Sequence, residues 1–372
     1  MSGFIPVNEP VLDGNEKKYL AECIDTGWIS SEGPFVRDLE LKFADRVGRK
    51  HGVAVCNGSA ALDAAAAALR FSAGDEVIMP TFTIISCASA ITRLGAKPVL
   101  VDCDASTWNM DIGAIEALIT PKTKAIMVVH LYGLPVDMNP VLELANRHNL
   151  LILEDAAEMI GQTYRGKQCG SFGDISTFSF YPNKHITTGE GGMVLTDDDD
   201  LAERTRSLRN LFFQPPRRFV HEELGWNFRM TNLQAAVGLA QLERLDEFIA
   251  RKRKSFARYM ELLDGVKGIQ LPVACTEYAD NINWVFGVVL DDEVPFDAVG
   301  AMKRLTDLGI GTRPFFWPMH EQPALRRMGL FNGEKYPNAE RIARRGFYLP
   351  SGLALTDDQQ VQVAQAVKGI LV

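Results

Sequence analysis

Short apolar runs recur along the first half of the 372-residue chain and alternate with segments of helical periodicity. The runs lie at residues 53–55, 77–79, 98–101, 125–129 and 150–153. Buried strands that alternate with helices are typical of an α/β fold with a mainly parallel sheet. Such sheets bind ligands at the carboxyl ends of their strands, so we expect reactive side chains directly after these runs.

The composition allows a large folded core. Hydrophobic residues make up 47% of the chain, which at this length is enough for one large and one smaller domain. We place the large domain, with an N-terminal arm, at residues 1–245 and the smaller one at residues 246–372. Within them we expect helices at residues 15–26 and 35–47, and one long amphipathic helix at residues 232–263 that crosses between the domains.

Charge and cysteine content argue against several classes of protein. The net charge of −8 is unsuited to a nucleic-acid surface. The six cysteines are scattered without a Cys-x-x-Cys pair, which favours neither a metal site nor a disulfide framework and indicates reduced thiols. The N-terminus lacks a basic segment followed by an apolar core, and no apolar run approaches the roughly 20 residues of a membrane helix. We expect a cytoplasmic protein that binds neither nucleic acid nor membrane.

One lysine lies at a predicted strand end within residues 171–196. An apolar and aromatic run, residues 175–181, leads to Lys184, and a glycine-rich stretch, residues 189–192, then lets the chain turn. Burial of this lysine would lower the pKa of its amine and make the amine nucleophilic. On this segment alone, an ordinary surface lysine in a loop is the simpler interpretation.

Asp155 follows the apolar run at residues 150–153 and so lies at the carboxyl end of a predicted strand. A carboxylate there needs a cationic partner. In a site for pyridoxal 5'-phosphate (PLP), Asp155 would pair with the protonated ring nitrogen, while Lys184 would hold the aldehyde carbon as a Schiff base. The alternative is a carboxylate that the dipole of a following helix stabilises.

Residues 56–62 predict a place for an anion. A strand, an Asn-Gly turn and the N-terminus of an alanine-rich helix follow one another, so backbone amides near Gly58 and the hydroxyl of Ser59 would face a phosphate ester. Ser59 is alternatively only the cap of the helix. Each segment alone is a weak signal, but the three in this order together favour a PLP site.

The motifs NGSAAL, PTFT, LEDAAE, TFSFYPNKHITTGEGG and GWNFRMTNLQAAVGLAQLE, in this order, resemble the DegT/DnrJ/EryC1/StrS family of PLP-dependent sugar aminotransferases. The resemblance covers nearly the whole chain. It implies a fold type I, aspartate aminotransferase-like architecture, with a large mainly parallel sheet domain and a smaller C-terminal α+β domain. Within the family, the chain looks most similar to members that aminate C4 of a nucleotide-linked 4-keto-6-deoxyhexose with L-glutamate as donor.

The resemblance also implies which residues hold the cofactor. Ser179 matches a serine that binds the cofactor phosphate, and Asn227 matches an asparagine that contacts this phosphate across the interface of a homodimer. Family members usually carry an aromatic ring-stacking residue where this chain has Ile84, so either Ile84 covers the ring by apolar contact or Phe82 reaches it. Glu158 would lie near the cofactor face, although a helix carboxylate at this spacing needs no special role.

Four further side chains are candidates for the substrate side. Trp28 and Ser30 lie in a segment that in the family is close to the active site, and hydrophobic anchoring of the N-terminal arm explains them about as well. His185, next to the lysine, is interpreted as a substrate-side group or an acid/base assistant. Arg229 is interpreted as a structural or phosphate-side arginine.

Three candidates lie near the C-terminal end of the resemblance. Arg313 is expected to accept a carboxylate of the amino donor, because a guanidinium fork suits that geometry. Trp317 and His320 are expected to line the sugar pocket. A packing role explains each of the three at least as well.

The implied reaction is a transamination. Glutamate leaves as 2-oxoglutarate after it has given its amino group to the cofactor, and the keto sugar then takes up the amine. Relatives that remove a hydroxyl carry histidine at the lysine position, so Lys184 favours amino transfer. Two alternatives remain: a transaminase of the same family that acts on a cyclitol or an aminoshikimate-type ring, and a PLP-binding regulator without turnover.

Overall fold

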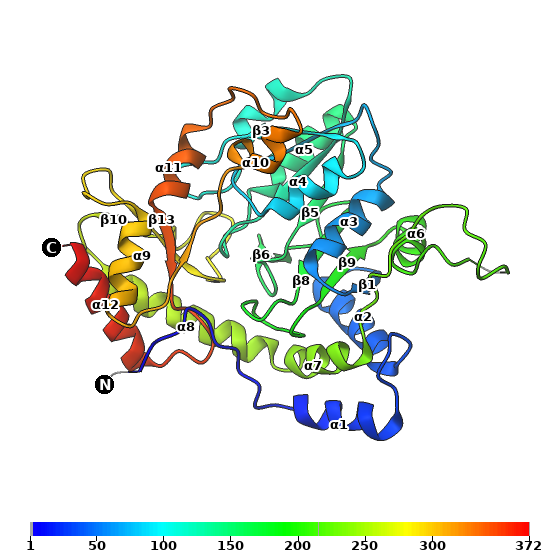
Figure 1. The fold of residues 1–372 in the computed structure, drawn as a ribbon, viewed down its shortest axis with the longest axis horizontal. Coiled ribbons are helices and arrows are strands. Elements are labelled where there is room, and N and C mark those ends of the chain that lie inside the picture. Colours follow the sequence, from blue (N-terminus) through cyan, green and yellow to red (C-terminus); the bar gives the residue numbers. More distant parts are fainter. Residues whose placement is uncertain (1–2, 215, 372) are drawn as a thin grey trace.

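The computed structural model describes residues 3–214 and 216–371, and a seven-stranded sheet forms its centre (Figure 1). In spatial order the strands are β1 (His51–Val55), β9 (Gly192–Thr196), β8 (Ile175–Ser179), β5 (Leu151–Asp155), β4 (Thr123–Val129), β2 (Glu76–Pro80) and β3 (Lys97–Val101). Strands β8, β5, β4, β2 and β3 run parallel to one another, whereas β9 is antiparallel to both of its neighbours, β1 and β8. The predicted α/β fold with a mainly parallel sheet is confirmed.

Helices cover both faces of this sheet. On one face lie α3 (Gly58–Ala68), α4 (Ile85–Thr92) and α6 (Asp199–Arg209), and on the other lie α2 (Pro34–Val47), α5 (Met138–His148) and α7 (Asn232–Leu242). Side chains of a strand point to alternate faces, so Val53 and Val55 join the first core and Ala54 joins the second. Because both faces are buried, these strands read as continuous apolar runs in the sequence.

A second, antiparallel sheet is built from the C-terminal third of the chain. Its strands, in spatial order, are β10 (Ile269–Gln270), β11 (Phe286–Leu290), β13 (Gly346–Leu349) and β12 (Arg313–Pro314). Helices α8 (Leu245–Leu263), α9 (Ala298–Asp307) and α12 (Asp357–Leu371) share a third core with this sheet and lie on the left in Figure 1. The other short elements are α10 (Pro323–Arg327), α11 (Pro337–Arg345), β6 (Thr163–Tyr164) and β7 (Lys167–Gln168). A domain boundary at residue 245 stays a prediction.

The N-terminal helices agree with the sequence, but the long helix predicted at residues 232–263 is wrong. Helix α1 (Glu16–Thr26) and helix α2 form where the periodicity placed them. The chain between α7 and α8 breaks at Glu243 and Arg244, a point without glycine or proline. Asn15 and Tyr19 donate hydrogen bonds of 2.7 and 2.6 Å to the Glu243 carboxylate, so the N-terminal segment contacts the break. Within the described residues, no helix is both long and apolar enough to cross a membrane.

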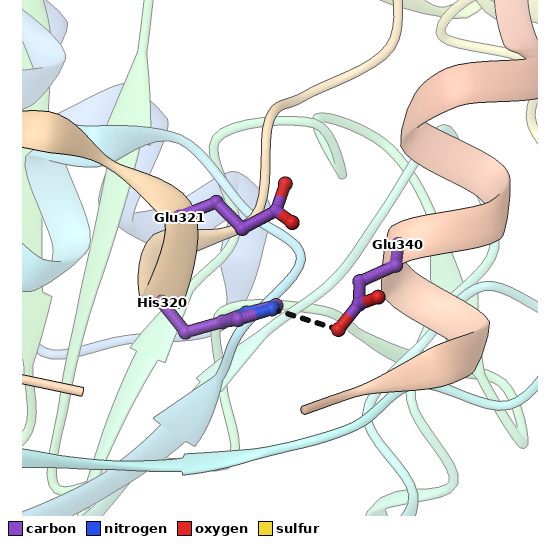
Figure 2. A group of neighbouring side chains, drawn as sticks. All are labelled: His320, Glu321 and Glu340. Carbon is purple, nitrogen blue, oxygen red and sulfur yellow. Dashed lines mark hydrogen bonds and ion pairs between the residues drawn. The ribbon is translucent and has the colours of Figure 1, made fainter. Parts of the chain in front are cut away.

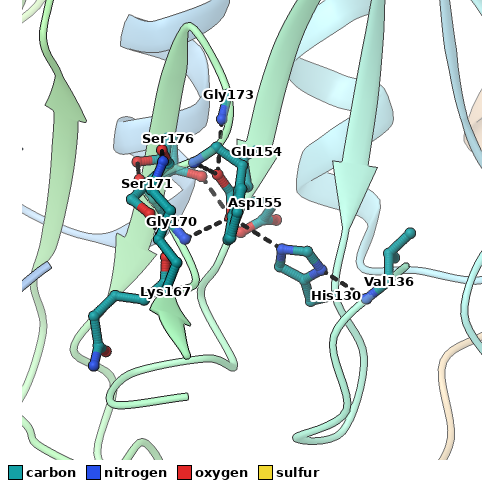
Figure 3. Close-up of polar contacts among 12 residues, drawn as sticks. His130, Val136, Glu154, Asp155, Lys167, Gly170, Ser171, Gly173 and Ser176 are labelled. Atoms are coloured by element: carbon teal, nitrogen blue, oxygen red, sulfur yellow. Dashed lines mark hydrogen bonds and ion pairs between the residues drawn. The ribbon is translucent and has the colours of Figure 1, made fainter. Parts of the chain in front are cut away.

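A buried carboxylate holds the end of β5 in place. Both oxygens of Glu154 accept hydrogen bonds, one from the backbone N–H groups of Phe172 and Gly173, each at 2.9 Å, and the other from the N–H of Gly170 and from His130 Nε2 at 3.1 Å (Figure 3). Burial opposes ionisation of Glu154, but the hydrogen bonds from His130 and from these backbone N–H groups hold its pKa below the usual value.

The same network gives His130 a structural role. Its Nδ1 accepts a hydrogen bond of 3.0 Å from the backbone N–H of Val136, so in the neutral ring Nε2 carries the proton that Glu154 accepts (Figure 3). The carboxyl end of β5 is thereby tied to the carboxyl end of β4, which His130 follows, and to the loop before β8. The side chain of Asp155, the residue after Glu154, lies on the opposite side of β5.

We expect the substitution Glu154→Gln to lower the free energy of unfolding by about 3 kcal/mol, because an amide NH₂ would face donors that then have no acceptor. The exposed Glu143 on α5 provides a matched control, and Glu143→Gln should change stability by less than about 0.5 kcal/mol. Urea unfolding of the two variants measures the difference. Equal stability of both variants would contradict the structural role of Glu154.

Candidate active site

A cavity of about 560 Å³ opens at the carboxyl ends of β4, β5 and β8, beside the N-terminus of α3. The large sheet and its helices contribute the polar lining, and the C-terminal third of the chain contributes Trp284, Phe316 and Tyr348. The sequence-predicted residues that line the cavity are Gly58, Ser59, Ile84, Asp155, Glu158, Ser179 and Lys184. Segments that are far apart in the sequence therefore converge at the edge of the sheet where α/β folds bind ligands.

Asp155 is buried at one side of the cavity, at the end of β5. One carboxylate oxygen accepts hydrogen bonds from the N–H of Ala157 at 3.1 Å and from the Thr177 hydroxyl at 3.3 Å. The other accepts a hydrogen bond from the thiol of Cys87, with Sγ at 3.3 Å. Burial raises the pKa of the Asp155 carboxyl, and these hydrogen bonds oppose the increase. The carboxylate is thus held in one orientation and still needs a cationic partner.

Lys184 brings an amine to the same cavity. Its side chain is only 9% exposed, and Nζ lies 3.9 Å from Glu158 Oε1 and 3.7 Å from the centroid of the Trp284 ring. Burial lowers the pKa of the Lys184 amine, and burial raises the pKa of Glu158 to about 8. The Glu158 carboxylate also accepts a hydrogen bond of 2.6 Å from the backbone N–H of Tyr132, which fixes its position. Burial thus favours the neutral form of the amine, which is the form a nucleophile needs.

The N-terminus of α3 forms the third side. Asn57 caps the helix by accepting the N–H of Ala60 at 2.8 Å, and the next two residues, Gly58 and Ser59, line the cavity. A Cβ atom at Gly58 would lie 2.8 Å from Cβ of Ser179, so only glycine permits this close approach of helix and strand. The helix N-terminus, two serines and this cradle suit a phosphate group, which is the fit that PLP requires.

The structure decides between the two candidates for the ring face. Ile84 is 41% exposed and lines the cavity, whereas Phe82 is fully buried and packs against Tyr132 and Phe316. Phe82 therefore does not reach the cavity. A ring bound there would contact the aliphatic side chain of Ile84, as the first of the two sequence-based alternatives expects.

Trp28, Ser30, Asn227 and Arg229 lie outside this cavity. Arg229 donates to Oδ1 of Asn227 and of Asn210, each at 2.9 Å, and lines a separate hollow of about 240 Å³. Trp28 is 50% exposed. A role for Asn227 at a cofactor phosphate would therefore be exerted in another copy of the chain, and these assignments stay predictions.

His185 is buried next to Lys184 but does not line the cavity. Neither ring nitrogen has a hydrogen-bond partner among the described residues. Burial and the nearby Lys252 amine lower the pKa of His185 to about 3, so the ring stays neutral at neutral pH. His185 therefore does not line the cavity of its own chain, and its interpretation as a substrate-side group or an acid/base assistant stays a prediction.

His320 does not line the cavity either. Its Nδ1 lies 2.8 Å from the Thr81 hydroxyl, and its Nε2 lies 3.1 Å from Glu340 Oε1 (Figure 2). Glu321 completes a group whose ligand-type atoms lie within 4.8 Å of one another. Arg344 donates to Glu321 Oε1 at 2.7 Å, whereas Glu321 Oε2 has no partner among the described residues, and we interpret the group as a packing contact between the PTFT segment and α11.

The other two C-terminal candidates also lie outside the lining. Trp317 is 44% exposed and stacks with the guanidinium of Arg344, and Arg313 is exposed on β12. Sequence reasoning missed Trp284, Phe316, Tyr348 and Cys87, which contact the cavity or its carboxylate. Trp284 precedes a strand, whereas Phe316 follows one, Tyr348 lies within one and Cys87 lies in α4, so no shared pattern in the sequence singles them out.

Known proteins share both the sequence and the fold. The profile of the DegT/DnrJ/EryC1/StrS aminotransferase family matches residues 10–368. A GDP-perosamine synthase of Caulobacter vibrioides is 47% identical over 370 residues, which cover 99% of this chain and 98% of the relative. DesV of S. venezuelae, solved in complex with a ketimine intermediate, has a TM-score of 0.88 at 36% identity, covering 95% of this chain and 94% of DesV. The PLP form of a Streptococcus pneumoniae protein described as a sugar aminotransferase has a TM-score of 0.92 at 25% identity, covering 99% and 98%.

The raised pKa of Glu158 predicts a pH dependence of stability. The folded carboxyl has a pKa of about 8 and the unfolded one a pKa of 4.5, so its contribution is fully present below pH 4.5 and is lost as the pH rises to about 8. We expect Glu158→Gln to remove this decline, which amounts to at most about 1.4 kcal/mol per pH unit. Thermal unfolding of the cofactor-free protein between pH 5 and 8 measures it, with Glu143→Gln as control. An unchanged slope in Glu158→Gln would contradict the assignment.

Proposed function

Because the chain belongs to the DegT/DnrJ/EryC1/StrS aminotransferase family, whose cofactor is PLP, we propose that it transfers the amino group of L-glutamate to a nucleotide-linked 4-keto-6-deoxyhexose. One observation carries the proposal: the amine of Lys184, the carboxylate of Asp155 and a phosphate-sized cradle at Gly58 line the same cavity. The relative named GDP-perosamine synthase supports a GDP-linked sugar that is aminated at C4.

The chain's own residues divide the binding of the cofactor among them. Asp155 would accept a hydrogen bond from the protonated ring nitrogen, because its carboxylate is buried and three hydrogen-bond donors already orient it. Gly58, Ser59 and Ser179 would hold the phosphate at the N-terminus of α3. Lys184 would bind the aldehyde carbon. Ile84 would cover one face of the ring.

PLP, when bound, supplies an electron sink that lets an amino group and a keto group exchange between two substrates. With the cofactor bound, Lys184 would move the proton: its free Nζ would take the proton from the donor's α-carbon and return it. Burial favours the neutral amine that this role needs. In the net reaction, L-glutamate and the keto sugar would give 2-oxoglutarate and the amino sugar, so an amino group and a carbonyl oxygen are exchanged, with one water consumed, one water released and no net oxidation.

We also propose that the chain acts as a homodimer with its sites at the subunit interface. The side chains of Trp28, Ile29 and Ile84 leave 50%, 48% and 41% of their surfaces exposed, so they offer apolar surface that a second copy could bury. Asn227 and Arg229 form a polar pair that lies outside the cavity of its own chain. A second copy would cover the apolar groups and receive this pair.

Lys184→Ala should abolish the absorbance band at about 400 nm that a lysine-bound PLP gives. The exposed Lys122 provides a matched control, and Lys122→Ala should retain the band. Absorbance spectra of both variants, each reconstituted with PLP, test the assignment of the nucleophile. A band that survives in Lys184→Ala would refute it.

A substrate panel tests the proposed reaction itself. GDP-, dTDP- and UDP-linked 4-keto-6-deoxyhexoses and keto cyclitols are each offered with glutamate, and products are identified by mass spectrometry. Amination of the GDP-linked sugar at C4 supports the proposal. Conversion of a keto cyclitol alone indicates the second transaminase class, and failure to form 2-oxoglutarate from glutamate indicates a regulator without turnover.

Mixing an inactive variant with one whose PLP binding is weakened tests the shared site, at a PLP concentration too low to saturate the weakened variant. If Lys184 of one copy and Asn227 of the other serve the same site, a dimer of one Lys184→Ala chain and one Asn227→Ala chain contains one intact site. We expect Asn227→Ala to weaken PLP binding at least about tenfold, since a hydrogen bond to a charged group is lost. Co-refolding should then restore up to about a quarter of the activity of the unsubstituted protein, as statistical pairing of two chains dictates. No restoration would place both residues in one chain's site.

A further inference from the structure

We propose that Trp284 is a positioning residue for Lys184, whose free amine rests on the face of the Trp284 indole ring whenever the amine is not bonded to the cofactor. The inference rests on the proposed role of Lys184. It concerns the step in which the lysine acts as an acid or base, because only then is the amine unattached. Trp284 comes from the C-terminal third of the chain, 100 positions after Lys184 in the sequence.

The geometry places the amine between an aromatic face and a carboxyl group. Nζ of Lys184 lies 3.7 Å from the centroid of the Trp284 ring and 3.9 Å from Glu158 Oε1. A cation within about 6 Å of an indole face is attracted by the ring quadrupole, and the attraction grows when the pair is desolvated. Trp284 and the Lys184 side chain are both buried. The contact therefore meets the conditions under which this interaction is strong.

Three contacts hold Trp284, two of them through the indole ring and one through the backbone carbonyl. Its Nε1 donates a hydrogen bond of 2.9 Å to the carbonyl of Asn183, the residue before the lysine. The backbone carbonyl of Trp284 accepts a hydrogen bond of 2.9 Å from the buried amine of Lys252. The ring stacks on Tyr132 with centroids 5.9 Å apart and an angle of 15° between the planes. Trp284 thus fixes both the backbone that carries Lys184 and the amine at its end.

This contact acts on the proton affinity of the lysine. Burial favours the neutral amine, and the ring face favours the ammonium ion, so Trp284 limits how far the pKa of Lys184 falls. Glu158 and Asp155 also favour the ammonium ion, whereas a positive charge on the Lys252 amine disfavours it. An amine that both takes and returns a proton needs a pKa near the working pH, which this balance serves.

The test compares two substitutions in the cofactor-free protein. Trp284→Phe keeps an aromatic face but loses the N–H bond to Asn183, and Trp284→Leu loses both. Both open similar space to water, so their difference isolates the ring face. Acetic anhydride labels neutral amines, and mass spectrometry of the Lys184 peptide across pH gives the titration midpoint of this one lysine.

We expect the Lys184 midpoint of Trp284→Leu to lie below that of Trp284→Phe by about 0.5 to 1 pH unit. Trp108→Leu is the matched control, because Trp108 is buried in the same aromatic group and contacts Tyr132 and Phe315. It should leave the midpoint unchanged. Equal midpoints of the Phe and Leu variants, or a higher midpoint in the Leu variant, would overturn the proposal.

A second measurement needs no substitution of Trp284. Protonation of an amine on the indole face should change the fluorescence of the unsubstituted protein with pH, and Lys184→Met should lack this component. A component that persists in Lys184→Met would also overturn the proposal. Both measurements use the cofactor-free protein, so they report on the Trp284 contact even if the substrate panel shows no transamination.

Discussion

Burial of one amine beside two carboxyl groups is the constraint on which the site depends. A lone ammonium or carboxylate away from water is costly, so buried charges are paired or neutralised. Here both occur: burial lowers the pKa of Lys184, and burial raises the pKa of Glu158 to about 8. Burial thus disfavours the charged form of both groups. Asp155, which hydrogen-bond donors surround, is the carboxylate best suited to stay ionised opposite a cationic ring.

The position of Asp155 depends on a further carboxylate, Glu154, which does not line the cavity. Glu154 and Asp155 are neighbours on β5, so their side chains leave opposite sides of the strand. Glu154 anchors the loop at Gly170 and Gly173, and this loop leads directly into β8. The carboxyl end of β5 is therefore tied to the segment that leads into the amino end of β8. A dipeptide of two acids divides structural and chemical work between the two sides of one strand.

The sequence allowed the strand-end residues to be predicted, because strand ends converge whatever the loops do. Asp155 and Lys184 are in one cavity for this reason. Two kinds of feature escaped prediction. The break between α7 and α8 depends on contacts from the N-terminal segment to Glu243, which no local pattern records. His185, adjacent to the lysine, is buried outside the cavity lining although Asn183 and Lys184 both line it, and no local pattern separates these neighbours.

The C-terminal third of the chain supplies what the large sheet cannot. Parallel strands and helix N-termini offer carboxylates, hydroxyls and backbone amides at their ends, but apolar residues there are committed to the two cores. Phe82 is an example: its ring packs against Tyr132 and Phe316, so Ile84 and not Phe82 lines the cavity where the cofactor ring would lie. Trp284, Phe316 and Tyr348 of the C-terminal third add aromatic surface to the cavity, to which Tyr181 also contributes. In the proposed arrangement the Trp284 ring contacts the amine of Lys184, so its aromatic face bears on proton transfer.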